Sequence, residues 1–438
     1  MVAQQMILSN TLQENALATP QRPTKGAAQV ITSFRASLCR GLIASTAILG
    51  LTAGFVPSSW ASSTVHQARA ADDDAGSRKG IMFTPLDANG ALTIGPGTVS
   101  AMRATGAGWI RVDFQTDKAG GLTPKFYAAY DALIGWLTSQ GFTILGLLGN
   151  GFAQADSLDA RTGKPYAGSP EDCQRDRYCE AAYNLHNSEF DGGNGDNPTI
   201  HAFAAQARTL AAHYPQIKYW ELWNEPNRFD EAKTSAKGGH CNQDAHTGYN
   251  CYGGTWIYPS NYAQLSHLVT QYIQVSIPDA VTISGGLFGQ SNSDISNQSY
   301  GITYLQDVYA YSDQARWRGS PWKYVGIHPY VCAGSAACPK PVDVRIRMRD
   351  YLRRMYDADH RFDMFVTEFG WEASAVGPDR QAQDIQAAYT VFKEWRKHVR
   401  MAAVFRWIDV GDNKTFGLLD KDNQQRPAYS MFTSISGF

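Results

Sequence analysis

The chain has 438 residues, of which 43% are hydrophobic and 18% are charged, and its formal net charge at pH 7 is −1. This composition is ordinary for a globular protein, and the length has room for one large domain or about two or three small ones. Because the charges balance, the chain offers no basic field for a nucleic acid and no polybasic surface for an acidic membrane. We therefore expect neither as a partner.

The N-terminal region, residues 1–70, reads as a leader with a secretory signal peptide. Arg35 and Arg40 precede an apolar run from Leu42 to Val56, and Ala68-Arg-Ala70 then matches a small-x-small cleavage site. The run contains Gly, Ser and Thr and is short for a transmembrane span. We predict a protein that is secreted, periplasmic or held at the cell surface, with no membrane contact after signal removal.

The residues on either side of this signal are polar. The stretch before Arg35 is long for a signal n-region, which favours translation from Val30; a disordered leader and a signal anchor are the alternatives. After the cleavage site, residues 71–79 are predicted to be an acidic linker.

From Gly80 onward, short apolar or β-branched runs alternate with longer amphipathic segments. The runs are predicted strands: Gly80–Thr84, Trp109–Phe114, Thr143–Leu148, Tyr219–Trp223, Val281–Ser284, Tyr324–His328, Met364–Thr367 and Ala402–Trp407. The clearest predicted helices lie between them: Pro124–Gln140, Pro198–His213, Asn261–Ile277, Val342–His360 and Asp379–Arg400.

Strands that alternate with helices in this way favour an α/β fold, and we predict a single (β/α)8 TIM barrel over residues 80–438. A doubly wound open sheet is the alternative. That fold predicts a glycine-rich phosphate loop after the first strand, and the sequence has none there.

Cysteine usage agrees with export. Of seven cysteines, Cys39 falls inside the signal, and the other six form three pairs that are close in sequence: Cys173 with Cys179, Cys241 with Cys251, and Cys332 with Cys338. An even number in an exported chain indicates disulfides, and nearest-neighbour pairing is favoured. A metal site is the alternative, but no CxxC or His-x₃-His spacing supports one.

The three cysteine pairs follow the third, fourth and sixth predicted strands. In a barrel these connections lie at the C-terminal face, where barrel active sites form. The connections after the third and fourth strands are also long and rich in Gly, Asn, Asp and Tyr. Disulfides there would reduce the entropy of long loops, which suits a braced cleft.

Two glutamates stand at the ends of predicted strands. Tyr219-Trp-Glu-Leu-Trp-Asn-Glu-Pro-Asn227 places Glu225 directly before a strand-breaking proline, and Met364-Phe-Val-Thr-Glu-Phe-Gly-Trp371 places Glu368 shortly before a glycine. Side-chain alternation puts Glu221, Trp223 and Glu225 on one face, and Val366 and Glu368 on another. Because strands four and seven face each other across a barrel, the two glutamates can approach within roughly 5 Å, the separation used in retaining glycoside cleavage.

These strand ends resemble those of the clan A glycoside hydrolases, and most of all the cellulase-like families 5 and 39. Trp223-Asn-Glu-Pro226 is similar to the acid/base motif of the clan, and Thr367-Glu-Phe-Gly370 to its nucleophile motif. The resemblance extends over about Gly80 to Phe438 and includes further positions that the clan uses to bind substrate: Arg111, His328, Tyr330 and Trp407.

The resemblance implies specific roles. Glu225 would be the acid/base, with a raised pKa, and Glu368 the nucleophile, kept ionised by Arg111 and Tyr330. Asn224 would bind the sugar 2-OH, and Trp407 would form the floor of the sugar subsite. Glu221 is interpreted as a partner inside the barrel, and Asp113 has no assigned role. Aromatic residues in loops could stack on sugars: Tyr252, Trp256, Tyr258, Trp322 and Trp371.

The sequence therefore predicts a secreted, monomeric, retaining β-glycoside hydrolase. Its partner would be an oligo- or polysaccharide, and we expect no metal or other cofactor. Endo-action on a polysaccharide is favoured, because braced loops suit an extended cleft. An exo-acting β-glycosidase, a transglycosylase and a non-catalytic glycan-binding barrel are the alternatives.

Overall fold

The computed structural model describes residues 76–87, 89–116, 121–149, 152, 198–228, 257–290, 299–312, 319–332, 338, 340–360, 363–411 and 414–438. All of them lie in one compact unit, Arg69–Phe438. Within these ranges, no helix combines the length and the apolar character needed to cross a membrane. The predicted signal and most of the predicted linker lie outside the described residues, as do four of the predicted disulfide cysteines: Cys173, Cys179, Cys241 and Cys251.

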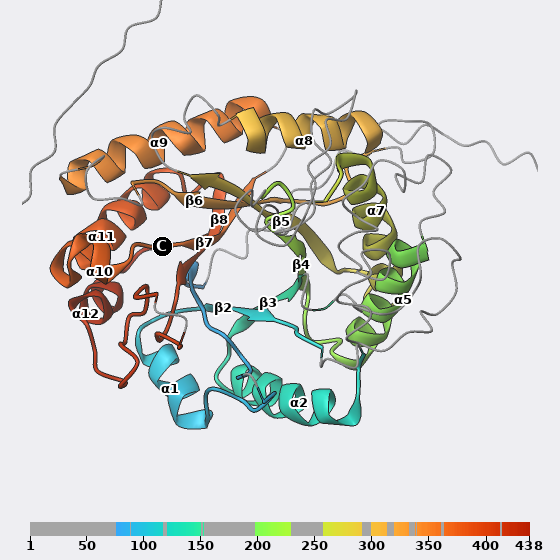
Figure 1. Ribbon diagram of the computed structural model, residues 1–438, viewed down its shortest axis with the longest axis horizontal. Coiled ribbons are helices and arrows are strands. Elements are labelled where there is room, and N and C mark those ends of the chain that lie inside the picture. Colours follow the sequence, from blue (N-terminus) through green and yellow to red (C-terminus); the bar gives the residue numbers. More distant parts are fainter. Residues whose placement is uncertain are drawn as a thin grey trace, which may run out of the picture. The chain divides into compact units, whose positions relative to one another are not determined.

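Eight parallel strands close into a barrel in the order of the sequence (Figure 1). They are β1 (Lys79–Met82), β2 (Trp109–Asp113), β3 (Thr143–Leu148), β4 (Tyr219–Asn224), β5 (Val281–Gln290), β6 (Val325–Tyr330), β7 (Met364–Phe369) and β8 (Val399–Phe405). β8 pairs with β1 and completes the ring. The predicted (β/α)8 barrel is confirmed, and the doubly wound sheet is wrong.

Helices surround the strands in Figure 1. The described ones are α1 (Pro96–Ala104), α2 (Pro124–Ser139), α5 (Pro198–His213), α7 (Pro259–Ser276), α8 (Ser299–Ser312), α9 (Pro341–Ala358), α10 (Ala373–Val376), α11 (Pro378–Glu394) and α12 (Pro427–Ser434). The sequence did not single out α1 and α8, because glycine in one and aromatic residues in the other weaken the helical signal. The helix predicted to run to Arg400 ends at Glu394, since β8 begins at Val399.

Helix α2 shows how the sequence specifies an element of this fold. The Thr123 side chain accepts a hydrogen bond from the Phe126 backbone N–H at 3.2 Å, and Pro124 occupies the first turn, where its missing N–H costs nothing. The helix buries one face against the barrel: Phe126, Tyr130, Leu133, Ile134 and Leu137. Its start and its packing face are therefore both encoded locally.

The barrel has two apolar layers. A large outer core fills the space between strands and helices. A small inner cluster fills the barrel, with side chains drawn from alternate strands, β3, β5 and β7, and from β8: Leu145, Ile283, Phe365, Met401 and Ala403. Further along the strands, towards their C-terminal ends, Arg111 and Glu221 replace these apolar side chains. The apolar cluster thus closes the barrel beneath a charged layer.

The N-terminal end of the barrel carries a buried lysine. The Lys79 ammonium donates hydrogen bonds to the carbonyl oxygens of Thr105 at 2.7 Å, Phe432 at 2.9 Å and Ile435 at 2.9 Å. Thr105 directly follows α1, Phe432 lies in the last turn of α12, and Ile435 directly follows α12. The ammonium therefore supplies hydrogen bonds to carbonyl groups at helix C-termini, which lack partners within the helix. Lys79 already belongs to β1, so the strand begins one residue before the predicted Gly80.

Candidate active site

The end of β4 turns two neighbouring side chains towards the barrel axis. Trp223 has a positive φ of 76° and Glu225 one of 50°, both in the left-handed region that costs energy for residues other than glycine. Trp223 therefore leaves the predicted face and packs against Phe203 of α5, with ring centroids 5.9 Å apart. Asn224 and Glu225 both reach the site as a result, so the predicted shared face of Glu221, Trp223 and Glu225 is wrong for Trp223.

The end of β7 is irregular in a similar way. Its pairing with β8 shifts register between Val366 and Phe369. Phe365 belongs to the inner cluster and Val366 to the outer core, so Val366 does not share the face that was predicted for Glu368. Thr367 and Glu368 both contact residues of the charged layer.

Arg111 lies at the centre of this layer and is fully buried. Its guanidinium donates to three side-chain oxygens: Glu221 Oε2 at 2.5 Å, Glu368 Oε1 at 2.5 Å and Asn224 Oδ1 at 2.9 Å. Burial alone would lower the pKa of Arg111, but the charges of Glu221 and Glu368 outweigh it and raise the pKa above its usual value. Arg111 therefore stays charged and forms a salt bridge with each of the two carboxylates.

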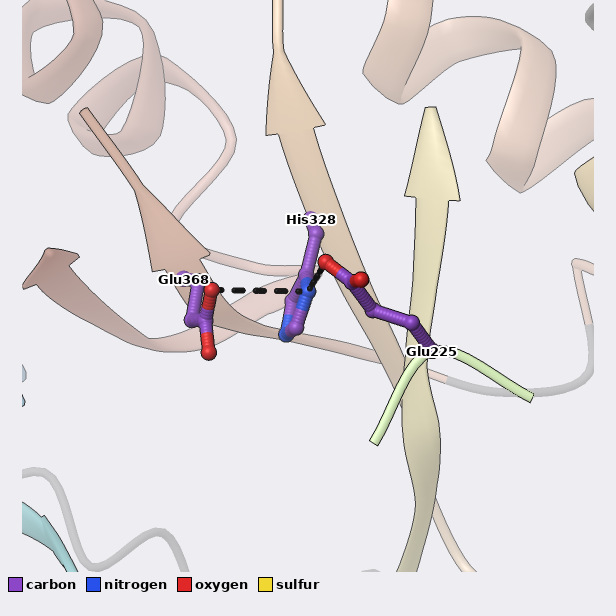
Figure 2. A group of neighbouring side chains, drawn as sticks. All are labelled: Glu225, His328 and Glu368. Atoms are coloured by element: carbon purple, nitrogen blue, oxygen red, sulfur yellow. Dashed lines mark hydrogen bonds and ion pairs between the residues drawn. The ribbon is translucent and has the colours of Figure 1, made fainter. Parts of the chain in front are cut away.

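β6 supplies two groups that face the glutamates. The Tyr330 hydroxyl donates to Glu368 Oε2 at 2.8 Å, and His328 Nδ1 lies 2.9 Å from Glu225 Oε1 and 3.7 Å from Glu368 Oε2. Burial, with the nearby charges of Glu368 and Glu225, raises the pKa of Tyr330, so its hydroxyl keeps the proton that it donates. Figure 2 shows His328 between the two carboxylates.

The two glutamates are close to each other. One carboxylate oxygen of each, together with a ring nitrogen of His328, lie within 4.8 Å of one another. Both residues are almost fully buried, at 3% exposed for Glu225 and 6% for Glu368. This separation matches the roughly 5 Å of retaining glycosidases and is shorter than the about 6.5–9.5 Å that inverting enzymes need for a water molecule.

Glu225 has side-chain partners, His328 and Arg228, whose contact with it the sequence did not reveal. Burial raises its pKa, but the hydrogen bond and charge of His328 and the charge of Arg228, whose NH1 lies 2.7 Å from Oε2, outweigh burial, and the net direction is down. The predicted raised pKa of Glu225 is therefore wrong. Arg228 follows Glu225 by three residues, and its guanidinium lies 4.6 Å from the Phe288 ring centroid.

Trp407 does not stand at the end of a strand. β8 ends at Phe405, and Trp407 is 2% exposed with its ring packed edge-on against Tyr429 at 5.7 Å. The β8 ring that lies beside Tyr330 is Phe405, at 6.4 Å. The predicted position of Trp407 is wrong, and its role as a sugar floor stays a prediction that its burial does not favour.

The predicted loop aromatics give a similar result. Tyr258, Trp322 and Trp371 are buried, and the Trp371 Nε1–H donates to the Val331 carbonyl at 3.0 Å. These three rings are therefore structural in the described part of the chain. Tyr252 and Trp256 lie outside the described residues.

A disulfide joins Cys332 to Cys338 directly after β6, with Cα atoms 5.6 Å apart. It holds the connection that follows Tyr330, and this one of the three predicted pairings is present in the structure.

The other two predicted pairings are not tested by the structure. Cys173 and Cys179 follow β3, Cys241 and Cys251 follow β4, and all four lie outside the described residues. The disulfide between Cys173 and Cys179 and the disulfide between Cys241 and Cys251 therefore stay predictions.

Asp113 sits at the end of β2, two positions beyond Arg111. Its Oδ2 accepts from the Gln115 side chain at 2.7 Å, while its buried Oδ1 has no hydrogen-bond partner among the described residues. Burial raises the pKa of Asp113. Glu221 is a partner inside the barrel, as predicted, because it accepts from Arg111, Thr367 and the Gly286 N–H.

Among the described residues, only Glu225, His328 and Glu368 converge closely enough to consider as metal ligands. Their oxygens already accept hydrogen bonds from Arg228, Arg111 and Tyr330. Two of these donors are guanidinium groups whose charge would repel a cation. The arrangement fits a pair of catalytic carboxylates better than a metal centre.

No family model and no curated protein matches the sequence. The structure is similar to that of a family 39 glycoside hydrolase from the gut symbiont Bacteroides cellulosilyticus WH2, with a TM-score of 0.50 and 18% identity over 81% of this chain. This chain covers 62% of that protein, less than two thirds of its length.

A second similar structure is GH5_18 from Streptomyces cattleya in complex with GlcNAc, with a TM-score of 0.51 and 13% identity over 82% of this chain and 79% of that one. A variant of the same protein in complex with Manβ1-4GlcNAc gives the same values. At these identities the similarities show a shared barrel fold. The resemblance to clan A glycoside hydrolases, including families 5 and 39, is confirmed for the fold.

Proposed function

We propose that the protein is a retaining β-glycoside hydrolase. One observation carries this proposal: two buried glutamates from the ends of β4 and β7 lie within 4.8 Å of a shared histidine and of each other. Glu368 is bound by Arg111 and Tyr330, whereas Glu225 is bound by His328 and Arg228. This asymmetry supports different roles for the two carboxylates.

Glu368 is the nucleophile in this proposal. The Arg111 guanidinium and the Tyr330 hydroxyl each donate a hydrogen bond to one of its oxygens and so orient the carboxylate. Its carboxylate attacks the anomeric carbon while the bond from that carbon to the leaving oxygen breaks, and Glu225 gives its proton to that oxygen. Water then attacks the same carbon, Glu368 leaves, and Glu225 takes a proton from the water.

Asn224 is placed to bind the sugar 2-OH. Its Oδ1 accepts from Arg111 at 2.9 Å, which fixes the amide and leaves its NH₂ available for a sugar oxygen next to Glu368. A hydrogen bond to the 2-OH strengthens as the oxocarbenium character develops. The partner is therefore an oligo- or polysaccharide, and the predicted export and endo-action are part of the same proposal.

The test is release of new reducing ends from a panel of β-linked polysaccharides and aryl β-glycosides. The panel should include Manβ1-4GlcNAc compounds, because a similar barrel binds that disaccharide. Glu368→Gln is the control. Cleavage by the parent and not by Glu368→Gln is expected, and the product lengths distinguish endo- from exo-action. Equal cleavage by both proteins, or binding without cleavage, would contradict the proposal.

A further inference from the structure

Four side chains form a continuous buried chain of hydrogen bonds beneath the candidate active site. Glu225 Oε1 lies 2.9 Å from His328 Nδ1, and His328 Nε2 lies 3.0 Å from Thr367 Oγ1. Thr367 Oγ1 in turn lies 2.8 Å from Glu221 Oε1. Their burial excludes bulk water as a competing partner. Each member therefore constrains the hydrogen positions of the next.

The direction of the chain is fixed at its Glu221 end. Glu221 Oε2 accepts from Arg111 Nε at 2.5 Å, and Oε1 accepts from the Gly286 N–H at 3.0 Å. The Glu221 oxygens accept from the Arg111 guanidinium and the Gly286 N–H, so the Thr367 hydroxyl points its hydrogen at Glu221. The oxygen of Thr367 then has only lone pairs left for His328, and Nε2 must carry a hydrogen.

The Nδ1 side of His328 follows from this. With Nε2 protonated, Nδ1 bonds Glu225 only if one further proton lies between Nδ1 and Oε1. Loss of that proton leaves a nitrogen lone pair facing a carboxylate oxygen at 2.9 Å, which is repulsive. The pair therefore resists losing its proton, whichever of the two atoms holds it.

We propose that Thr367, anchored by Glu221, is a positioning residue that fixes His328 as the Nε2–H tautomer, so that Glu225 and His328 hold a single shared proton for the leaving group. The delivery step rests on the proposed function; the tautomer does not. When the leaving oxygen takes the proton, the carboxylate of Glu225 faces the Nδ1 lone pair and becomes a stronger base. The attacking water returns one proton to the pair, and the cycle balances.

Other charged groups face His328 without deciding its tautomer. Glu368 Oε2 lies 3.7 Å from Nδ1, and the Tyr330 ring packs edge-on against the His328 ring with centroids 6.3 Å apart. The Tyr330 hydroxyl donates to Glu368 and the Arg228 guanidinium to Glu225, so neither of these groups hydrogen-bonds a ring nitrogen of His328 among the described contacts. β5 presents only backbone here, because a Cβ on Gly286 would lie 2.0 Å from Nε2 and 2.7 Å from Thr367 Oγ1. Within the described residues, Thr367 is the hydrogen-bond partner of Nε2.

The direct test is nitrogen NMR of the full-length protein with ¹⁵N-labelled histidine, followed over pH. The chain has 10 histidines, and the His328 signals are identified by their loss in His328→Asn. In the parent, the neutral imidazole of His328 should carry its hydrogen on Nε2. In Thr367→Val, the neutral imidazole should instead carry its hydrogen on Nδ1 and donate it to Glu225.

Two controls separate the tautomer from packing. Thr367→Ser keeps the hydroxyl and should keep the parent tautomer. Thr282→Val removes a hydroxyl from another buried strand position, where it bonds Thr270 at 3.0 Å, and should leave the His328 signals unchanged. Each variant is compared by its melting temperature, so that unfolding is not mistaken for a change of tautomer.

Activity tests the delivery step. Thr367→Val allows His328 to satisfy ionised Glu225 without the shared proton, so the alkaline limb of kcat/KM should move to lower pH. On substrates with poor leaving groups we expect roughly tenfold loss on the alkaline side, the worth of about one hydrogen bond, and little loss on activated aryl glycosides. Thr367→Ser should restore the parent profile.

The outcomes are distinct. The proposed tautomer would be contradicted if neutral His328 in the parent carried its hydrogen on Nδ1. It would also be contradicted if Thr367→Val gave the same His328 signals as the parent. The expected signals with an unchanged pH profile in Thr367→Val would overturn the delivery step. The expected signals in a protein that cleaves no sugar would leave the tautomer standing and reject the proposed function.

Discussion

The two ends of the barrel each bury a cation, and they hold it in different ways. At the N-terminal end, Lys79 is bound by neutral backbone carbonyls, and burial with the nearby Lys393 charge lowers its pKa from 10.5 to about 8. At the C-terminal end, Arg111 is bound by two carboxylates, which raise its pKa. Lys79, which can lose its charge, binds only helix ends. Arg111, whose charge is permanent, lies beside Glu368, the proposed nucleophile.

The largest effect should come from removing the permanent charge. Arg111→Met leaves Glu221 and Glu368 as buried, unpaired carboxylates, so we expect destabilisation of about 3–5 kcal/mol and loss of activity. Arg111→Lys keeps the positive charge but loses the planar guanidinium that binds three side-chain oxygens. We therefore expect this variant to keep most of its stability and to lose most of its activity. Urea unfolding and kcat/KM measure both. Parent-like stability of Arg111→Met would show that the Arg111 charge does not stabilise the fold.

Glu225→Ala should have the next largest effect, and one that depends on the substrate. Turnover of poor leaving groups should fall by about 10²–10⁴-fold because acid assistance is lost, whereas activated aryl glycosides should be largely spared. The check is a series of aryl glycosides of graded leaving-group pKa. An equal loss across the series would remove Glu225 from the acid/base role.

Arg228→Ala should change the pH profile more than the maximal rate. The charge and hydrogen bond of Arg228 lower the pKa of Glu225, so removing them should let that pKa rise. The acid then keeps its proton to higher pH, and the alkaline limb of kcat/KM should move upward. Arg228→Lys, which keeps the charge, is the matched control. A limb that moves downward in Arg228→Ala would contradict this electrostatic assignment.

The smallest effect on catalysis should come from the opposite end of the barrel. Lys79→Met leaves helix-end carbonyls without their donor and should destabilise the fold by about 1–3 kcal/mol, with parent-like kcat/KM below the unfolding temperature. Because the folded pKa of Lys79, about 8, is below the ordinary 10.5, the parent should gain stability as pH rises between these values. Lys79→Met should lack that gain. Loss of activity in folded Lys79→Met would contradict the view that the N-terminal end of the barrel contributes to stability but not to catalysis.

The sequence predicted the barrel and the two glutamates because strand periodicity, a proline and a glycine are local signals. It could not predict which faces Trp223 and Val366 take, since these depend on a positive φ and on a register shift. Thr367 was missed for the same reason: regular alternation places it opposite Glu368.

The sequence also could not predict which charged and polar groups surround Glu225. His328 is more than one hundred residues away from it, and Arg228 reaches it only through the turn after β4. Phe405 rather than Trp407 lies beside Tyr330 because β8 ends two residues before the tryptophan. Strand ends are positions where a shift of one or two residues changes which side chain faces the site.

The central claim is that Glu368, oriented by its hydrogen bonds from Arg111 and Tyr330, forms a covalent bond with the sugar. The most direct measurement is incubation with a 2-deoxy-2-fluoro glycoside of the sugar that the parent cleaves, followed by mass spectrometry of the digested protein. We expect one glycosyl adduct, carried by the peptide that contains Glu368, and none in Glu368→Gln. An adduct on a different residue, or cleavage that releases product of inverted configuration, would contradict the account.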